Sequence, residues 1–232
     1  MVSRRERLRA ETTEEIKTIA LKLMASGGPD AITLRAIARE MGMTAGAIYG
    51  YFPTRDDLVT TLISDVYTSL VDKAEAARDA LPPGDAGGRI LAWGMAFREW
   101  SLANPEGFRL IYGDPVAGYV PPEGGPAAEA ERRACTGLTE LVATAWPEAS
   151  HRQPEDKYRW SDFDRPFADY IRVKFPDLPP AGVALALRIW GRMHGPVALE
   201  VYGHLTPQSK HPEKLYRAEL LDLVGSLGLT AS

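Results

Sequence analysis

Apolar residues recur along most of the chain at intervals of three and four, which is the spacing of one face of an α-helix. Sustained apolar and polar alternation of the strand type is absent. Proline and glycine clusters separate the helical stretches, at 82–84, 113–115, 121–126 and 179–180. The pattern therefore predicts an all-α fold.

Four helices are predicted in the N-terminal part of the chain, each preceded by a threonine that can cap it. Their expected spans are about 12–25, 33–41, 45–51 and 54–80. The expected caps are Thr12 or Thr13, Thr33, Thr44 and Thr54. The expected core residues are Ile16, Ile19, Ala20, Leu23, Leu34, Ile37, Ile48 and Phe52.

The second and third of these helices are short, and the sequence Met41-Gly42-Met43-Thr44 joins them. A glycine at the turn and a capping threonine after it are typical of a helix-turn-helix, whose second helix lies in the major groove of DNA. Small residues at 45–47 would let that helix approach base edges and phosphates, and nearby tyrosines can donate hydrogen bonds to phosphates. The alternative is an ordinary helical hairpin with exposed tyrosines.

The stretch from Thr33 to Leu58 resembles the TetR (tetracycline-repressor-like) transcription regulators. The matching elements are T-x-R-x-I-A from Thr33, G-x-T from Gly42, and G-x-I-Y-x-Y-F from Gly46. A basic residue, Arg55, and x-x-L follow. The resemblance covers about residues 12–65 and implies an N-terminal helix-turn-helix domain.

The resemblance also implies roles for individual residues. Phosphate contacts would come from Thr33, Thr44 and Tyr51, and Arg55 would clamp the DNA backbone, with arginine in place of the usual lysine. The residues nearest the bases would be Arg35, Ala45, Gly46 and Tyr49.

Charge is unevenly distributed along the chain. The formal net charge is −4, but residues 1–60 carry nine basic and eight acidic side chains, and the remainder carries eighteen and twenty-three. Arg4, Arg5, Arg7 and Arg9 face only Glu6 among the first ten residues. We expect a flexible basic arm over residues 1–11 that can neutralise phosphates; a frayed, solvated terminus is the alternative. The predicted domains are 1–58, which includes this arm and binds DNA, and 59–232.

The larger domain is expected to contain helices at about 86–103, 105–112, 124–146, 155–175, 180–204 and 212–227. Trp93, Phe97 and Trp100 share one helix face. Apolar pockets between helices are common small-molecule sites, and the resemblance implies an effector pocket in this domain. The candidate ligand-binding residues are Trp93, Phe97, Trp100, Tyr112, Phe163, Phe167, Tyr170, Trp190, Met193 and His194. Simple core packing is the alternative.

The segment 188–196 is similar to the W-x-x-x-H-G element of a C-terminal domain type found in some TetR-like regulators, and 102–110 resembles the same subgroup. Trp190 and His194 are four residues apart and so share a helix face. His194 could bond a ligand, titrate near neutral pH, or be a satisfied core group. Pro196 predicts a kink.

The last two predicted helices carry apolar faces that could pair with a second copy as a four-helix bundle. Packing within one chain is the alternative. DNA recognition favours a homodimer, because a two-fold dimer places two helix-turn-helix units where they can recognise a palindrome.

Several classes of protein are not supported by the sequence. The only cysteine, Cys135, cannot form an intrachain disulfide and fits a reducing cytoplasm. No apolar run is long enough for a membrane helix, and the charged N-terminus does not resemble a secretory signal. The four histidines lack metal-binding spacing, and common catalytic motifs are absent. We expect no metal, no cofactor and no enzymatic activity.

Together these features predict a cytoplasmic, dimeric transcription regulator that binds double-stranded DNA. We expect a repressor that a small-molecule effector releases from a palindromic operator. The alternative is a helical small-molecule-binding protein or enzyme whose N-terminal hairpin is only structural.

Overall fold

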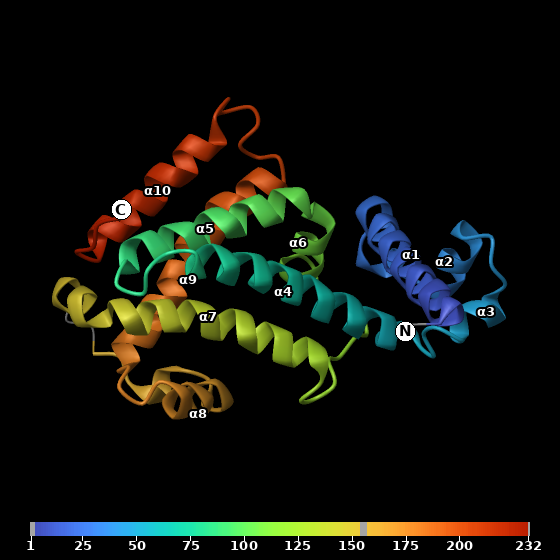
Figure 1. Ribbon diagram of the computed structural model, residues 1–232, viewed down its shortest axis with the longest axis horizontal. Helices are drawn as coiled ribbons and strands as arrows, with labels where there is room; N and C mark the ends of the chain where they lie inside the picture. Colours follow the sequence, from blue (N-terminus) through green and yellow to red (C-terminus); the bar gives the residue numbers. More distant parts are fainter. Residues whose placement is uncertain (1–2, 154–156, 232) are drawn as a thin grey trace. The chain divides into compact units, whose positions relative to one another are not determined.

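The computed structural model describes residues 3–153 and 157–231, and that part of the chain is helical and without strands (Figure 1). The predicted all-α fold is confirmed. The α-helices are α1 Arg4–Gly27, α2 Leu34–Glu40, α3 Ala45–Tyr49, α4 Arg55–Asp79, α5 Ala86–Ala103, α6 Pro105–Tyr112, α7 Pro126–Ala149, α8 Arg165–Lys174, α9 Pro180–Val201 and α10 Pro212–Ser226.

The chain forms two compact units. Unit 1 comprises Met1–Thr68 and Asn104–Glu131, and unit 2 comprises Ser69–Ala103 and Arg132–Ser232. Helices α4 and α7 each contribute residues to both units. The predicted boundary at residue 58 therefore falls within unit 1, near the start of α4.

Local capping explains why α2, α3 and α4 begin where the sequence predicts. Thr33 Oγ1 accepts a hydrogen bond from the Ala36 amide at 3.2 Å, and Thr44 Oγ1 accepts one from the Ala47 amide at 3.2 Å. Gly42, in the turn between α2 and α3, has φ of +65°, a conformation that favours glycine. At α4, the Thr54 amide donates to Asp57 Oδ2, and the Asp57 amide donates to Thr54 Oγ1.

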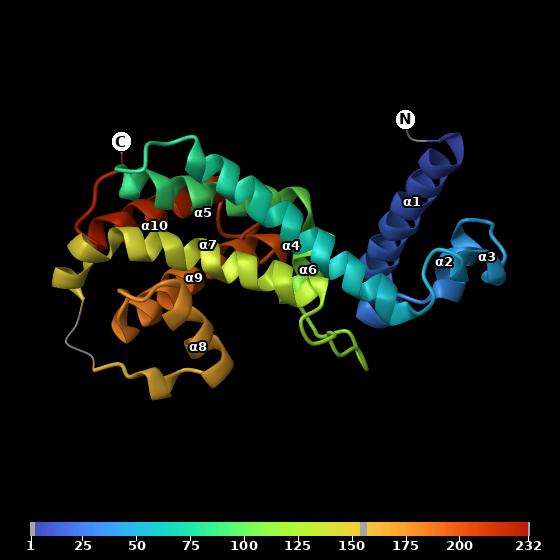
Figure 2. The same cartoon turned by 60° about the horizontal axis from the view of Figure 1, so that its bottom comes forward.

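Helix α1 begins eight residues earlier than predicted. Ser3 Oγ accepts from the Glu6 amide at 3.2 Å, and the Ser3 amide donates to Glu6 Oε2 at 2.7 Å, which forms a capping box. The hydroxyls of Thr12 and Thr13, predicted as caps, instead donate to carbonyls one turn earlier in the same helix. The prediction of a flexible basic arm is therefore wrong, because its arginines belong to a continuous helix (Figure 2).

The core of unit 1 lies among α1, α2, α3 and the first turns of α4, and α6 packs against α1. Most predicted core residues are buried there. The exceptions are Ile19 and Leu23, which are half-buried, whereas Met24 is buried. The buried stripe of α1 is thus Ile16, Ala20 and Met24, with a spacing of four throughout.

Unit 2 is built around α5, α9 and α10, which pack against one another. Gly94 of α5 permits close approach, since a Cβ there would lie 2.8 Å from the Leu220 side chain of α10. The buried Tyr216 hydroxyl donates to the Gly94 carbonyl at 3.1 Å, and burial raises the pKa of Tyr216. Tyr216 therefore remains a neutral hydrogen-bond donor in the core.

Several helix boundaries differ from the predictions. The helix predicted at 155–175 begins partly outside the described residues, and α8 itself starts only at Arg165, after one 3₁₀ turn at Trp160–Asp162. Proline is favoured in the first turn of a helix, and Pro166 stands there in α8. Helix α3 ends at Tyr49 rather than at 51. Helix α9 continues past Pro196 to Val201.

Candidate functional site

Helices α2 and α3 present a polar surface opposite their buried faces. In α3, Ile48 is completely buried, whereas the neighbouring Tyr49 is 47% exposed. An exposed tyrosine beside a buried isoleucine makes this short helix amphipathic. The other predicted DNA-contacting residues exposed on this surface are Thr33, Arg35, Thr44, Ala45 and Gly46.

The start of α3 is sterically open. A Cβ added at Gly46 would meet no atom within 4 Å other than those of the adjacent residues and the backbone of its own helix. The flanking Ala45 and Ala47 are exposed and carry only methyl groups. Another macromolecule can therefore approach the backbone of α3 closely at this point.

Arg55 is held inside unit 1 by backbone carbonyls. Its Nε donates to Ile32 O at 2.7 Å, its Nη2 donates to Pro29 O at 3.3 Å, and its Nη1 donates to Ala117 O at 3.0 Å. These bonds give Arg55 a bracing role that sequence reasoning missed, because its partners are main-chain atoms distant in the sequence. The contact between Arg55 and a DNA phosphate stays a prediction.

Tyr51, which follows α3, is half-buried against α1. The Arg9 guanidinium lies over its ring, 4.9 Å from the ring centroid, and Arg9 Nη2 donates to Gly50 O at 2.7 Å. This pairing joins the first turns of α1 to the end of the helix-turn-helix.

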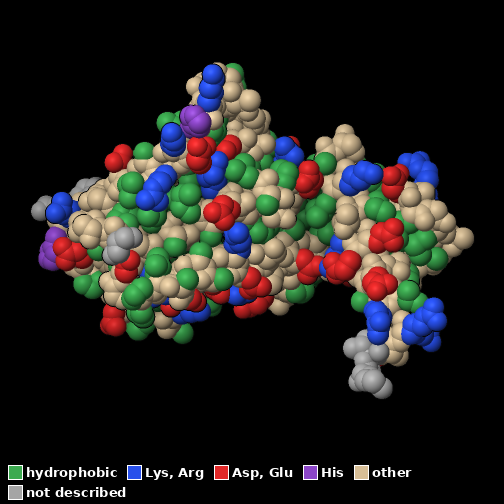
Figure 3. Space-filling model, turned by 45° about the horizontal axis from the view of Figure 1, so that its top comes forward, with side chains coloured by type: hydrophobic (Ala, Val, Ile, Leu, Met, Phe, Trp, Pro, Cys, Tyr) green, Lys and Arg blue, Asp and Glu red, His purple; other side chains and the backbone are tan. Residues whose placement is uncertain are grey.

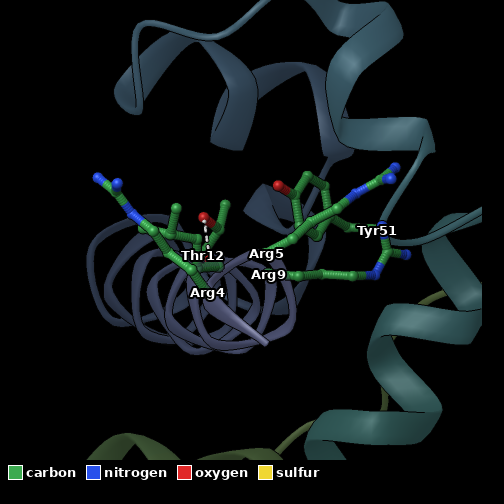
Figure 4. Close-up of a pocket in the computed structure, with 6 residues that line it drawn as sticks. Arg4, Arg5, Arg9, Thr12 and Tyr51 are labelled. Carbon is green, nitrogen blue, oxygen red and sulfur yellow. Dashed lines mark hydrogen bonds between the residues drawn. The ribbon is translucent and has the colours of Figure 1, made fainter. Parts of the chain in front are cut away.

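An open hollow of about 520 Å³ lies where α1 meets Tyr51 (Figure 4). Its lining residues are Arg4, Arg5, Leu8, Arg9, Thr12 and Tyr51. Blue side chains gather around the beginning of α1 in the space-filling view (Figure 3). Sequence reasoning found the arginine cluster but not its location beside Tyr51.

The three aromatic residues predicted to share a face of α5 are all buried in unit 2. Trp93, Phe97 and Trp100 are 7%, 6% and 5% exposed, respectively. The Trp100 indole donates to Ser69 Oγ at 3.0 Å. Trp93 packs against α7 at Gly137, where a Cβ would lie 2.5 Å from its ring. All three side chains are therefore buried, and their role in ligand binding stays a prediction.

Helix α9 places His194 close to Phe97 of α5. The His194 ring lies 6.2 Å from Phe97 and 5.4 Å from Trp190, measured between ring centroids. Burial lowers the pKa of His194, so the imidazole is neutral at neutral pH. Met193 is buried, whereas Trp190 is 45% exposed.

The remaining candidate ligand residues lie in other groups. Phe163, Phe167 and Tyr170 are half-buried around a core cluster of Ile171, Leu178 and Val183. Tyr112 belongs to unit 1, where its ring lies 6.1 Å from Tyr67 and 5.1 Å from Phe108. The ten candidates are thus divided between the two units, and within unit 2 they lie on three different helices and the turn before α8.

Within residues 3–153 and 157–231, no group of three or more histidine, cysteine, aspartate or glutamate side chains is arranged to hold a metal ion. No helix in the same ranges combines the length and apolar character needed to cross a membrane.

The capped pair α2 and α3, with its buried and exposed faces, defines a helix-turn-helix protein of the DNA-binding class. Comparison with known families agrees. Residues 18–62 match the bacterial regulatory proteins of the tetR family, and residues 90–223 match the tetracyclin repressor-like C-terminal domain. The chain belongs to the TetR family of transcription regulators.

Individual relatives support this assignment. The chain is 30% identical over 207 residues to the HTH-type transcriptional regulator Rv1816 of Mycobacterium tuberculosis, which covers 87% of this chain and 86% of that protein. The crystal structure of SCO4313, described as a regulatory protein, is 31% identical, with a TM-score of 0.68, and covers 96% of this chain and all of that one. The TetR family regulator PfmR of Thermus thermophilus shares the fold, with a TM-score of 0.61 at 14% identity, over 92% of this chain and 97% of that one.

Proposed function

We propose that this TetR-family regulator is a homodimeric repressor that binds a palindromic operator and is released from it by a small-molecule effector. The observation that carries the proposal is the exposed face of α3, on which Tyr49 stands 47% exposed beside an open helix start. In an isolated hairpin such an aromatic side chain would have little to contact, whereas in a major groove it meets bases and phosphates.

The proposed roles of individual residues are those that the resemblance to the TetR family implies. Thr33, Thr44 and Tyr51 would hold phosphates. The residues that would lie nearest the bases are Arg35, Ala45, Gly46 and Tyr49. Arg55 would act mainly through the positioning of α2, because it bonds the carbonyls of Pro29 and Ile32 just before that helix.

Exposed apolar side chains on α9 and α10 support dimerisation through these two helices. Leu187, Trp190 and Leu199 of α9 are 45–46% exposed, and Leu215 and Leu221 of α10 are 55% and 42% exposed. Large exposed apolar side chains on two packed helices favour binding of a partner. A second copy of the chain would complete a four-helix bundle there.

The effector would bind in unit 2, near Phe97 and His194. Their contact joins α5 to α9, and Trp190 extends the aromatic surface toward solvent. Trp190, His194 and Gly195 would place this C-terminal domain in the W-x-x-x-H-G subgroup. An effector that binds one conformation of unit 2 more tightly than another would shift the protein toward that conformation. The free energy of operator binding would change by at most the difference between the effector's binding free energies for the two conformations. We propose that the protein acts in the cytoplasm.

The test is selection of bound duplexes from a random DNA library, followed by gel shifts across a salt series. A palindromic consensus that binds tightly in the presence of competitor DNA is expected. Binding that is weak and indifferent to sequence at every salt concentration would refute the proposed function.

A further inference from the structure

We propose that the first two turns of α1 form a second DNA-contacting element, in which Arg4 and Arg5 bind backbone phosphates beside the groove that α3 reads. In this element Arg9 is a positioning residue that fixes α1 against Tyr51. The inference rests on the proposed function, because it assumes that the helix-turn-helix binds DNA.

Arg4 and Arg5 have defined positions. The Ser3 and Glu6 capping box begins α1 before Arg4, so Arg4 and Arg5 are held by helical geometry. An arginine on an ordered helix loses less conformational entropy on binding than one on a flexible arm does.

Helix α1 is attached to the helix-turn-helix. Arg9 Nη2 bonds the Gly50 carbonyl at 2.7 Å, and the Arg9 guanidinium stacks on Tyr51. Tyr51 is itself a residue expected to contact phosphate. The start of α1 is therefore fixed beside a point where the DNA backbone would pass.

The lining of the hollow is positively charged. Arginines supply half of the residues that line the hollow, and none of the lining residues is a carboxylate. Among the described residues, Arg4 and Arg5 form no ion pair, whereas many arginines of unit 2 do. Figure 4 shows the Arg5 and Arg9 guanidinium groups on the same side as the Tyr51 ring, and the Arg4 group on the opposite side. Two diverging guanidinium groups suit successive phosphates better than one small ion.

The shape of the hollow favours a polymer over a small ligand. Its volume of about 520 Å³ is open rather than enclosed, and it lies along the surface of α1. An open basic groove follows a sugar-phosphate backbone, whereas small-molecule sites usually bury most of their ligand.

The experiment compares the full-length protein with the double variant Arg4→Ala/Arg5→Ala on the duplex obtained from the random-library selection. Each phosphate contact contributes about 0.9 to the slope of log K against log salt. The double variant should therefore lose about 1.8 from this slope for each bound subunit. Alanine preserves the helix, and circular dichroism checks that the fold is retained.

The matched control is Arg165→Ala/Lys174→Ala, which removes the same charge from exposed positions of α8 in unit 2. Its slope should equal that of the unchanged protein. If the control lost as much slope as the Arg4 and Arg5 variant, the effect would come from net charge alone, and the proposal would be overturned. An unchanged slope in the Arg4 and Arg5 variant, on a duplex that the unchanged protein binds specifically, would overturn it while leaving the proposed function intact. Absence of specific binding by the unchanged protein would instead refute both.

Lysine variants separate charge from positioning. Arg4→Lys/Arg5→Lys should restore the salt slope, because lysine also neutralises phosphate. Arg9→Lys should keep the slope but lower affinity about tenfold, because lysine cannot combine the Tyr51 stacking with the carbonyl bond in the same geometry. Unchanged affinity of Arg9→Lys would remove Arg9 from the positioning role.

Discussion

Arg98 and Glu200 form a two-point ion pair that joins α5 to α9 in unit 2. Arg98 Nε and Nη2 donate to the two carboxylate oxygens at 2.7 and 2.6 Å, and the two side chains are only 11% and 15% exposed. Two parallel hydrogen bonds of this kind compensate both charges at a site with little solvent exposure. The same two helices carry Phe97 and His194, so the ion pair fixes the spacing of the proposed effector region.

The first prediction concerns this pair. Glu200→Gln leaves the Arg98 charge buried without its counter-ion and should lower the free energy of unfolding by about 3–5 kcal/mol. Urea unfolding followed by tryptophan fluorescence measures this in unit 2, since all five tryptophans lie there. The double variant Arg98→Met/Glu200→Leu should recover most of the loss. Equal losses in the single and double variants would mean that packing, not the unpaired charge, dominates.

Arg55 provides a second prediction. Arg55→Ala removes three hydrogen bonds to carbonyls and should cost unit 1 about 2–3 kcal/mol. Faster hydrogen exchange in α2, with unchanged tryptophan fluorescence, is the expected result. Arg39→Ala, at an exposed position of α2, is the control and should leave exchange unaltered. Normal exchange in Arg55→Ala together with weaker DNA binding would instead support the phosphate clamp that the resemblance implies.

Tyr49 is expected to act through DNA and not through the fold. Tyr49→Ala should change stability by no more than about 0.5 kcal/mol, because the side chain is largely exposed. Affinity for the selected duplex should fall about tenfold, the effect of one lost groove contact. Tyr158→Ala, at another exposed tyrosine in unit 2, is the control. Undiminished affinity would exclude Tyr49 from the reading face.

Trp190 tests the proposed dimer. Trp190→Glu puts a charge on the apolar face of α9 and should weaken self-association at least about 30-fold, as expected for a central aromatic contact. Sedimentation over a concentration series measures this. Val173→Glu is the matched control, because Val173 is an 85% exposed apolar residue on α8. A Trp190 variant that stays dimeric at low concentration would show that the interface lies elsewhere.

His194 predicts a pH dependence. Burial lowers its pKa in the folded state, so the unfolded chain takes up this proton first as pH falls. The stability contribution of the neutral imidazole is fully present above the unfolded value of about 6.5 and is lost as pH falls through the folded pKa. His194→Gln should flatten the decline in unfolding free energy below about pH 6.5. Parallel profiles for the His194 variant and the unchanged protein would contradict this.

Local signals explain what the sequence predicts well. Thr33, Gly42 and Thr44 act on neighbouring backbone atoms, so their roles are readable without knowledge of the fold. The capping box of α1 is also local, and the S-x-x-E pattern at Ser3 and Glu6 was the signal that could have placed its start correctly.

Long-range contacts explain the remainder. Arg9 and Arg55 bond main-chain carbonyls 41 and 23 residues away, and sequence patterns carry no mark of such partners. The candidate ligand residues are a similar case. Helical spacing assigns Trp93 and Phe97 to one helix face, but it could not show that Tyr112 belongs to a different compact unit from Phe163.

The empty space at Gly46 has an evolutionary consequence. Because a Cβ at this position meets no atom within 4 Å beyond the adjacent residues and its own helix backbone, most side chains can be introduced there without disturbing the core of unit 1. Replacement of a helical glycine also tends to stabilise the helix, by about 0.5–1 kcal/mol for alanine. Gly46 is among the residues proposed to lie nearest the bases. On that proposal, a single substitution after gene duplication would let one copy acquire a new operator preference while both copies still folded, so divergence of recognition need not pass through an unstable intermediate.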